Sequence, residues 1–380
     1  MVKELKISFL GDICPVNRVE EALLNNDFSN FRAIRKILIN QDLVIANLEC
    51  PLTESHEKIR KIGPNLKGHP KSVNLLKYLN IGITALANNH ILDYGHTGFS
   101  DTIKLLKEND IEFVGAGLNV NEASTPLLKT INGITICIIN VCEREFNIAG
   151  TNTAGANPFD IVSIIRDIRK YRNKVDFIIL YYHGGIEYYN LPTPEMFKNF
   201  GFLAKAGIDI IVCNHQHVLS GYQKQSGSHI FYGLGNFIFD WGSMRNNQWN
   251  YGIILNLTLR DKKAESFEIV PYEQCNSTSG LVLNSSISEK VFKELDILNS
   301  KLTEDSIEKE WGKFVSQNNT NLLGELFIQN KYLRYLLKKT GLIRGLITKG
   351  HKRRLFNYFN CQSHSEFARD SLKEGLNRLQ

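Results

Sequence analysis

The chain of 380 residues lacks any apolar run of about 18 residues, the length that a membrane-spanning helix requires. Its beginning, MVKELKISFLGD, places charges among the first six positions and continues directly into a strand-like segment. It therefore has neither the apolar core nor the cleavage site of a secretory signal peptide. These absences predict a cytoplasmic protein, with any membrane contact confined to the surface of the inner face.

Paired cysteines and a strong charge excess are also missing. The seven cysteines are odd in number, scattered, and never spaced as Cys-x-x-Cys, which predicts reduced and mostly buried thiols. Lysine and arginine number 45 against 39 aspartate and glutamate residues, so the net charge is +6. This excess is too mild to indicate nucleic-acid binding, and the basic tail carries no RNA- or DNA-binding motif.

The chain does contain an alternation of strand-like and helix-like segments through about residue 240. Seven short β-branched and aromatic segments are expected to be strands: Lys6–Leu10, Leu43–Ala46, Ile83–Ala87, Ile134–Val141, Phe177–Tyr182, Ile208–Cys213 and His229–Tyr232. Five amphipathic segments are expected to be helices: Phe31–Asn40, Ser72–Leu79, Gly98–Asn109, Ile161–Asn173 and Pro194–Ala206. The alternation predicts an α/β layered domain. Two later strands, Tyr251–Leu259 and Ser266–Pro271, are expected to form a hairpin at the edge of a second sheet.

The sequence changes in character after about residue 285. Ser286–Asn299 and Ser306–Val315 have helical patterns, and no strong strand follows. We therefore expect an α/β domain at 1–284 and a helical, basic C-terminal region at 285–380. Within the latter, Lys331–Arg354 holds nine basic residues and no acidic one, interleaved with leucine and isoleucine. Such a segment suits either weak contact with an anionic membrane surface or a solvated helix packed on the main domain.

Residue types that bind metals follow five of the seven predicted strands. The five motifs are Gly11-Asp12, Asn47-Leu48-Glu49, Asn88-Asn89-His90, His183-Gly184-Gly185 and Asn214-His215-Gln216-His217. Sites in open α/β sheets form outside the carboxyl ends of the strands. We therefore expect these residues to converge, although they are far apart in the sequence.

Each motif alone also has a simpler interpretation. Gly11-Asp12 suits a turn, Asn88-Asn89-His90 suits a helix cap, and His183 suits a packed core histidine. His215-x-His217 is more specific, because alternate residues of an extended loop place two imidazoles on one face. Four of the ten histidines fall at strand ends, and we interpret the set jointly as a metal site.

The chemistry of these side chains suits a hydrolase. Carboxylates and imidazoles together bind divalent metals such as Mn, Fe and Zn. Two ions about 3.5–4 Å apart need a bridging carboxylate, which Glu49 or Asp12 can supply, and such ions activate water for attack. A nearby imidazole would protonate the leaving oxygen. The sequence thus predicts a divalent metal cofactor of one or two ions.

Six stretches, in this order, resemble the CapA (poly-γ-glutamate capsule) family, a branch of the calcineurin-like metallophosphoesterase superfamily. They are FLGDICPVNR, LVIANLECPLT, TALANNHILDYGHTG, ILYYHGGIEY, IIVCNHQHVLSGYQ and IFYGLGNFIFD. The resemblance implies a four-layer α/β/β/α sandwich of the metallophosphoesterase type with a two-metal site. Here a helical C-terminal appendage would follow it.

The resemblance also implies a metal-ligand set. One metal would be held by Asp12, Glu49 and His217, and the other by Glu49, Asn89, His183 and His215, so that Glu49 bridges the two. Many superfamily phosphatases have Asp-x-His at the first strand, whereas this chain reads Asp12-Ile13-Cys14. The first metal is therefore left with three clear protein ligands. The family's His-Trp-Gly is His183-Gly184-Gly185 here, and Asn214 replaces the usual glycine before His-x-His.

Roles beyond the metal ligands are implied in the same way. His90 takes the position of the acid that meets the leaving group, and Asp93 would orient its imidazole. Glu187 and Tyr188 lie on the loop beyond His183 and are expected to face the substrate. The segment Gly235-Asn236-Phe237 is expected to be a turn that supports the site.

Two functions are open at this point. The first is a metal-dependent hydrolase that acts on a phosphoester, or on a γ-glutamyl bond of a capsule or related cell-surface polymer; the resemblance implies this substrate class. The second is a non-enzymatic, metal-binding assembly factor for capsule polymer synthesis, which the incomplete first-strand motif favours. The expected partners are a polyanionic polymer or phosphoester substrate and the capsule-synthesis machinery, and no nucleic acid.

Overall fold

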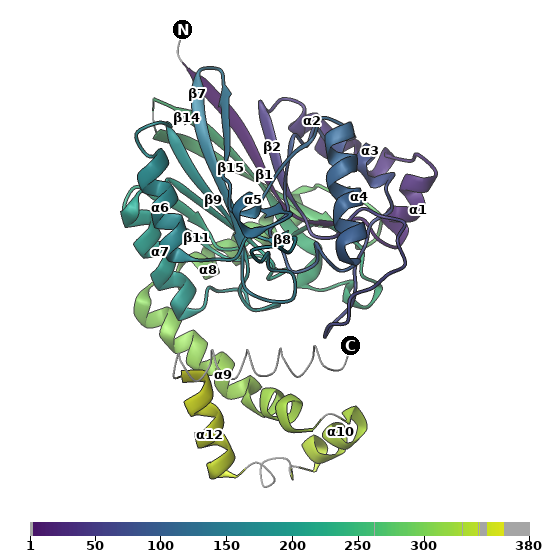
Figure 1. Cartoon of the computed structure of the whole chain (residues 1–380), viewed down its shortest axis with the longest axis vertical. Helices are drawn as coiled ribbons and strands as arrows, with labels where there is room; N and C mark the ends of the chain where they lie inside the picture. Colours follow the sequence, from purple (N-terminus) through teal and green to yellow (C-terminus); the bar gives the residue numbers. More distant parts are fainter. Residues whose placement is uncertain (1–2, 262, 329, 341, 343–347, 361–380) are drawn as a thin grey trace. The chain divides into compact units, whose positions relative to one another are not determined.

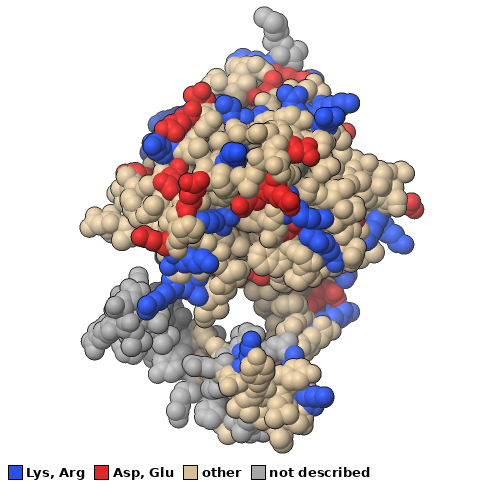
Figure 2. Space-filling view, turned by 90° about the vertical axis from the view of Figure 1, so that its right-hand side faces the viewer, with Lys and Arg blue, Asp and Glu red and all other residues tan. Residues whose placement is uncertain are grey.

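The computed structural model describes residues 3–261, 263–328, 330–340, 342 and 348–360. The chain divides into two compact units, Met1–Ile307 and Glu308–Gln380 (Figure 1). The change of sequence character at residue 285 falls inside the first unit. The expected division into regions 1–284 and 285–380 stays a prediction. On the face of the first unit that Figure 2 shows, acidic and basic side chains are interspersed, which agrees with the small net charge.

The first sheet combines parallel and antiparallel strands. Among the described residues, its order is β16 (Leu281–Val282), β15 (Lys263–Gln274), β14 (Tyr251–Arg260), β1 (Glu4–Cys14), β2 (Leu43–Leu48), β3 (Ile83–Ala85) and β4 (Glu112–Val114). An eighth strand, β13 (Asn236–Phe239), also pairs with β1, in parallel. The hairpin β14–β15 forms as predicted, but it extends the sheet that contains the N-terminal strands.

The second sheet has parallel strands at its centre. Within the described part of the chain, its order is β11 (Tyr222–Gln225), β12 (Ser228–Phe231), β10 (Ile210–Asn214), β9 (Phe177–His183), β7 (Ile134–Cys142) and β6 (Leu127–Ile131). A small two-stranded sheet joins β5 (Ala116–Gly117) to β8 (Gly155–Ala156).

The two sheets pack face to face over an apolar core. Leu5, Ile7 and Phe9 of β1 belong to the same buried cluster as Ile138 of β7 and Ile179 of β9. Because side chains alternate along a strand, residues of opposite parity face outward. Leu10, for example, belongs to a second cluster, in which the first sheet packs against helices. The core between the sheets therefore holds them together as a sandwich.

Helices cover both outer faces of the sandwich (Figure 1). The first sheet is covered by α1 (Arg18–Leu24), α2 (Arg32–Leu38), α3 (Ser72–Tyr78) and α4 (Gly95–Glu108), whose apolar residues join that second cluster. The second sheet is flanked by α6 (Ile161–Tyr171) and α7 (Pro194–Ala206). Shorter or later helices of this unit are α5 (Val120–Ala123) and α8 (Ser285–Asn299). This confirms the predicted α/β/β/α sandwich.

The sequence interpretation of residues 235–237 as a turn is only partly right. Gly235 has a positive φ of 73°, but Asn236 begins β13 and lies opposite Asp12 of β1. A parallel strand of four residues carries little local signal, because its hydrogen-bond partners lie more than 200 positions away. The tertiary pairing with β1 converts this segment into a strand.

The C-terminal part of the chain is helical, as predicted. Its described helices are α9 (Glu304–Phe327), α10 (Lys331–Lys339) and α12 (Lys349–Asn360). No helix in the described residues is long and apolar enough to cross a bilayer. Within the predicted basic segment Lys331–Arg354, residues 341 and 343–347 lie outside the described residues.

Candidate metal centre

The polar residues that end the predicted strands lie together in the structure. Asp12 lies on β1, while Glu49 and Asn89 follow β2 and β3. The second sheet contributes the last residue of β9 and the turn after β10. All six predicted metal ligands are buried: Asp12, Glu49, Asn89, His183, His215 and His217. The first sheet thus supplies the carboxylates and the amide, and the second sheet supplies the three imidazoles.

Two groups of three ligand atoms form around one shared carboxylate. Glu49, His183 and His215 make one group, and Asp12, Glu49 and His217 make the other; within each, the ligand atoms lie within 4.8 Å of one another. The Oε1 atom of Glu49 is 3.5 Å from His183 Nε2 and 3.7 Å from His217 Nε2. A metal pair bridged by Glu49 would need this arrangement.

Glu49 is the residue that most requires a cation. Its side chain is fully buried, and neither carboxylate oxygen has a hydrogen-bond partner in the described structure. A buried carboxylate without partners is strongly unfavourable unless it is neutralised or coordinates a metal. The residues around it therefore fit a bound divalent ion.

Direct contacts also link the predicted ligands to one another and to their neighbours. His183 Nε2 lies 3.0 Å from Asn89 Oδ1 and 3.1 Å from His215 Nδ1. Asp12 accepts hydrogen bonds from Asn47 Nδ2 at 2.7 Å and from the backbone N–H of His215 at 3.1 Å. These contacts tie the first sheet to the second directly at the cluster.

A bulge in β1 directs Asp12 toward the cluster. The pairing of β1 with β2 slips by one residue between Leu10 and Asp12, which leaves Gly11 as the extra residue. A Cβ atom at Gly11 would lie 1.8 Å from the carbonyl oxygen of Gly235, so a side chain does not fit there. Bulges commonly re-aim side chains beside functional sites. This one requires glycine at position 11 and turns Asp12, inside β1, toward the cluster.

The turn after β10 is strained where it carries the two histidines. The φ angles of His215 and His217 are 97° and 59°, in a region that residues with side chains rarely adopt. His217 Nδ1 lies 2.9 Å from Asn236 Oδ1, and Asn236 Nδ2 donates to the carbonyl oxygen of His217 at 3.2 Å. Backbone strain that is held by surrounding contacts is typical of functional sites.

Burial shifts the pKa values of the clustered groups in the direction that favours their uncharged forms. It raises the pKa of Asp12 to about 7 and raises that of Glu49 well above its ordinary value, where the charge of Asp12 adds to the effect. It lowers the pKa of His217 to about 3 and that of His183 well below its ordinary value, and neighbouring imidazoles lower both further. Because the raised pKa values favour protonated carboxyl groups and a metal needs them ionised, metal binding here would be coupled to proton release.

His90 and Asp93 form a separate pair beside the cluster. His90 Nδ1 lies 2.6 Å from Asp93 Oδ2. Because a carboxylate only accepts, this contact places a proton on Nδ1 and leaves Nε2 for another partner. Burial lowers the pKa of His90, while Asp93 opposes the shift. Lys61 Nζ lies 2.5 Å from Asp93 Oδ1, with which it forms an ion pair. It also lies 3.0 Å from His90 Nδ1, but an ammonium only donates and therefore does not bond to a protonated Nδ1.

A pocket of about 290 Å³ opens beside the cluster. It is lined by predicted site residues, by Lys61 with its neighbours and by several aromatic side chains: Asn89, His90, Glu187, Tyr188, His217, Lys61, Ile62, Gly63, Pro64, Leu66, Glu145, Phe146, Phe239, Trp241 and Trp249. Burial raises the pKa of Tyr188 to about 12, so its hydroxyl remains a hydrogen-bond donor at neutral pH. Both residues predicted to face substrate, Glu187 and Tyr188, therefore line this pocket.

Two polar residues at the site were missed by the sequence interpretation. Lys61 lies in the irregular segment between β2 and α3, where no periodic pattern marks it. Glu145 lies just beyond β7, and its Oε2 atom accepts a hydrogen bond from Asn89 Nδ2 at 3.1 Å. The rule that found the other residues, polar side chains after the carboxyl end of a strand, also applies to Glu145.

The cysteines are buried thiols, as predicted, for the six that the structure describes; Cys361 lies outside the described residues. Cys14 stands where the sequence resemblance led us to expect a histidine. Burial raises its pKa well above the ordinary value, and the neighbouring Cys50 raises it further. In the described chain, Cys14 belongs to neither group of ligand atoms.

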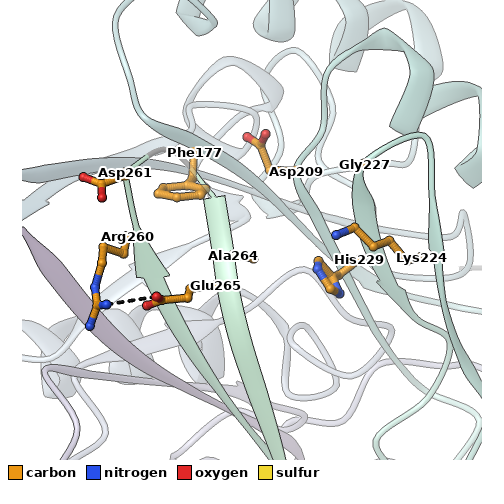
Figure 3. A pocket seen from close by; sticks show the side chains of 9 residues that line it. All are labelled: Phe177, Asp209, Lys224, Gly227, His229, Arg260, Asp261, Ala264 and Glu265. Carbon is orange, nitrogen blue, oxygen red and sulfur yellow. Dashed lines mark hydrogen bonds and ion pairs between the residues drawn. The ribbon is translucent and has the colours of Figure 1, made fainter.

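A larger cavity of about 490 Å³ lies at the opposite, amino-terminal ends of β9 and β10 (Figure 3). Its lining includes Asp209, which pairs with Arg172 at 2.6 Å. Arg260, on the facing hairpin, pairs with Glu265 at 2.9 Å. Asp209 and Arg260 are thus already paired, and neither group of metal-ligand atoms found in the described residues lies at this cavity. The strand-end cluster is therefore the candidate site.

Comparisons with known proteins point to one family. The family model described as "Bacterial capsule synthesis protein PGA_cap" matches residues 6–241. The PGA biosynthesis protein CapA of Bacillus subtilis is 30% identical over 298 residues, which cover 77% of each chain. The capsule biosynthesis protein CapA of Bacillus anthracis is 29% identical over 304 residues, covering 77% of this chain and 73% of the relative. A solved structure of a phosphatase from Mycoplasma pneumoniae is 16% identical and covers 78% of this chain and 100% of that one, with a TM-score of 0.47.

Proposed function

Because this chain belongs to the PGA_cap family of bacterial capsule synthesis proteins, we propose that it is a metal-dependent hydrolase in capsule or cell-surface polymer biosynthesis. The observation that carries the proposal is Glu49, whose buried carboxylate has no hydrogen-bond partner and is shared by two groups of ligand atoms. This geometry suits two cations better than it suits any purely structural role.

The predicted ligand set would divide between two ions. Asp12, Glu49 and His217 would hold the first, and Glu49, Asn89, His183 and His215 would hold the second. Mn, Fe and Zn all suit these oxygen and nitrogen donors. Ions bound there would supply polarisation of the bond to be cleaved and activation of water for attack.

His90 supplies the proton to the leaving group. Its Nδ1 proton is engaged by Asp93, which fixes the ring so that Nε2 faces away from that pair. Burial lowers the pKa of the ring and so favours its neutral form before substrate arrives. An anionic substrate beside the ring then favours the protonated form, and the ring can pass that proton to the leaving oxygen or nitrogen.

Glu187 and Tyr188 position the substrate in the pocket. Tyr188 is half exposed, and its ring centroid lies 6.1 Å from that of Trp249. Its backbone N–H donates to the carbonyl oxygen of Gln216 at 2.9 Å, so this loop is anchored next to the metal-site turn. The substrate is a phosphoester or a γ-glutamyl bond of a polyanionic capsule polymer, and the capsule-synthesis machinery supplies or receives it.

The metal content of the purified protein tests the proposal. Protein prepared without a histidine tag is expected to contain one or two equivalents of Mn, Fe or Zn per chain, and His215→Ala is expected to lose at least one of them. The Nδ1 atom of His215 lies 3.1 Å from His183 Nε2, so the substitution removes one of the three ligand atoms of that group. Elemental analysis measures the content, and hydrolysis of phosphodiesters and γ-glutamyl amides is then assayed with the loaded protein.

Absence of metal from both proteins after incubation with Mn and with Zn would contradict the proposal. A loaded wild type that cleaves none of these bonds would contradict the hydrolase but leave the metal site standing.

A second candidate is the non-enzymatic assembly factor. Cys14 favours it, because this side chain lies outside both groups of ligand atoms in the described residues and the first ion would then have three protein ligands. In that case the metal would be structural or would grip carboxylates of the polymer. Cells that carry His215→Ala and still make normal amounts of polymer would favour a role without metal chemistry.

The basic C-terminal segment Lys331–Arg354 is proposed to make weak contact with an anionic membrane surface. In α10, Tyr332, Leu333, Tyr335 and Leu336 are exposed beside basic residues, a pattern typical of helices that lie in the membrane interface. The protein is expected to sediment with anionic vesicles at low salt and to dissociate as salt is raised. Failure to bind at low salt would leave a solvated helix as the explanation.

A further inference from the structure

Glu145 lies between two ligands of the second ion without belonging to either proposed ligand group. It follows β7, the central strand of the second sheet that the sequence interpretation did not associate with the site. Its side chain is about one third exposed and lines the pocket. Its Oε2 atom accepts from Asn89 Nδ2 at 3.1 Å, and its Oε1 atom lies 3.8 Å from His215 Nε2.

The contact with Asn89 determines which way that amide points. A carboxylate only accepts hydrogen bonds, so the Asn89 nitrogen must face Glu145. The amide oxygen then faces the cluster, where it lies 3.0 Å from His183 Nε2. Only the oxygen of an amide can bind a cation, and a flipped amide would point its N–H groups at the ion.

The same loop holds Asn89 at a second point. Asn147 Nδ2 donates to the backbone carbonyl oxygen of Asn89, and Asn147 is buried. The backbone and the side-chain amide of Asn89 are thus fixed separately by two residues of one loop. Asn147 fixes the position of Asn89, whereas Glu145 fixes the orientation of its amide.

The contact with His215 acts on the other ligand. At 3.8 Å the contact is longer than a hydrogen bond, so the carboxylate acts through its charge, which favours the tautomer with its proton on Nε2. That tautomer leaves Nδ1 free, and Nδ1 is the atom that lies 3.1 Å from His183 Nε2. Metal-binding histidines generally donate the other ring N–H to a carboxylate or carbonyl oxygen. One side chain therefore presets two ligands of the same ion.

We propose that Glu145 is a positioning residue for the second metal ion, which orients the Asn89 amide and selects the metal-binding tautomer of His215. This rests on the proposed function in that it requires the metal centre. It goes beyond that function by giving a role to a residue outside the ligand set. Binding of the ion at Asn89, His183 and His215 depends on Glu145, whereas binding of the ion at Asp12 and His217 does not.

Titration of the metal-free full chain with Mn²⁺ tests this, followed by calorimetry or by the electron paramagnetic resonance signal of free Mn²⁺. Glu145→Ala is expected to weaken one of two binding steps by about 10–100-fold, the usual loss when such a partner of a metal ligand is removed. The other step should keep its wild-type affinity. Glu145→Gln keeps an acceptor oxygen for Asn89 Nδ2 and should recover part of the loss.

Glu143→Ala is the matched control, because it removes a carboxylate from the same loop that accepts instead from the hydroxyl of Tyr182 at 2.6 Å. It should bind both ions normally, and the unfolding temperature of metal-free Glu145→Ala should equal that of the wild type. Equal weakening of both steps, wild-type binding by Glu145→Ala, or the same loss in Glu143→Ala would overturn the inference while leaving the metal centre intact. A wild type that binds no Mn²⁺ would instead overturn the proposed function itself, and this inference with it.

Discussion

Glu49→Gln is expected to abolish tight binding of both metal ions while leaving the metal-free protein at least as stable as the wild type. Glu49 is the one residue shared by both groups of ligand atoms in the described structure, so its loss affects both ions. Glutamine has nearly the same shape but cannot bridge two cations. Because burial raises the pKa of Glu49 well above its ordinary value, the wild-type carboxyl destabilises the metal-free fold when it is ionised, and the neutral amide removes that cost.

Thermal unfolding with and without Mn²⁺ measures both effects. Saturation at 100 times the dissociation constant stabilises the wild type by about 2.7 kcal/mol for each bound ion, and Glu49→Gln should gain none of this. Asp167→Asn is the matched control, since Asp167 is a buried carboxyl on α6 whose pKa is also raised by burial. Metal-dependent stabilisation of Glu49→Gln equal to that of Asp167→Asn would show that Glu49 does not bridge the ions.

His90→Gln is expected to lower the turnover of any phosphodiester or γ-glutamyl amide that the wild type cleaves by about 10²–10⁴-fold, with both metal ions retained. His90 lies next to the predicted ligand Asn89 in sequence, but in the described structure it belongs to neither group of ligand atoms. Its contacts run to Asp93 and Lys61 instead. The loss should therefore fall on kcat, and elemental analysis should find the metal content unchanged.

His96→Gln provides the comparison for this variant. His96 lies six residues later, on α4, with Ser100 as its hydrogen-bond neighbour at 3.2 Å, and its replacement should leave turnover unchanged. Equal rates for His90→Gln and the wild type would remove His90 as the proton donor. If polymer production in cells tolerated His90→Gln fully, while the wild type cleaved none of the tested bonds, the assembly-factor alternative would take precedence.

Much of the fold could be predicted from the sequence because its signals are local. The central strands are short, continuous apolar runs, and the predicted helices on both outer faces have amphipathic patterns. The family resemblance, which the family model and the two CapA relatives confirm, rests on the same strand-end motifs. A strand such as β13 is different, because its four residues are strand only through pairing with β1.

The same distinction applies to the candidate site. Asp12, Glu49 and the three clustered histidines carry a signal because each follows a recognisable strand, although their roles as ligands stay predictions. Lys61 could not be found in this way: the path of its segment is set by contacts to Asp93, which accepts from the backbone N–H of Leu66 at 2.7 Å. Such long-range contacts leave no periodic pattern of apolar residues in the sequence, so they cannot be predicted from it.

The division of the predicted ligand set between the two sheets has a consequence for how the protein would mature. Asp12, Glu49 and Asn89 leave the ribosome early, but the imidazoles of the second sheet follow only after residue 183, and the last of them is His217. A growing chain therefore lacks the complete set of predicted metal ligands until more than half of it has been translated and the two sheets have packed together. Capture of metal would be a late event in biogenesis, and it would mark those copies of the chain whose two halves have come together correctly.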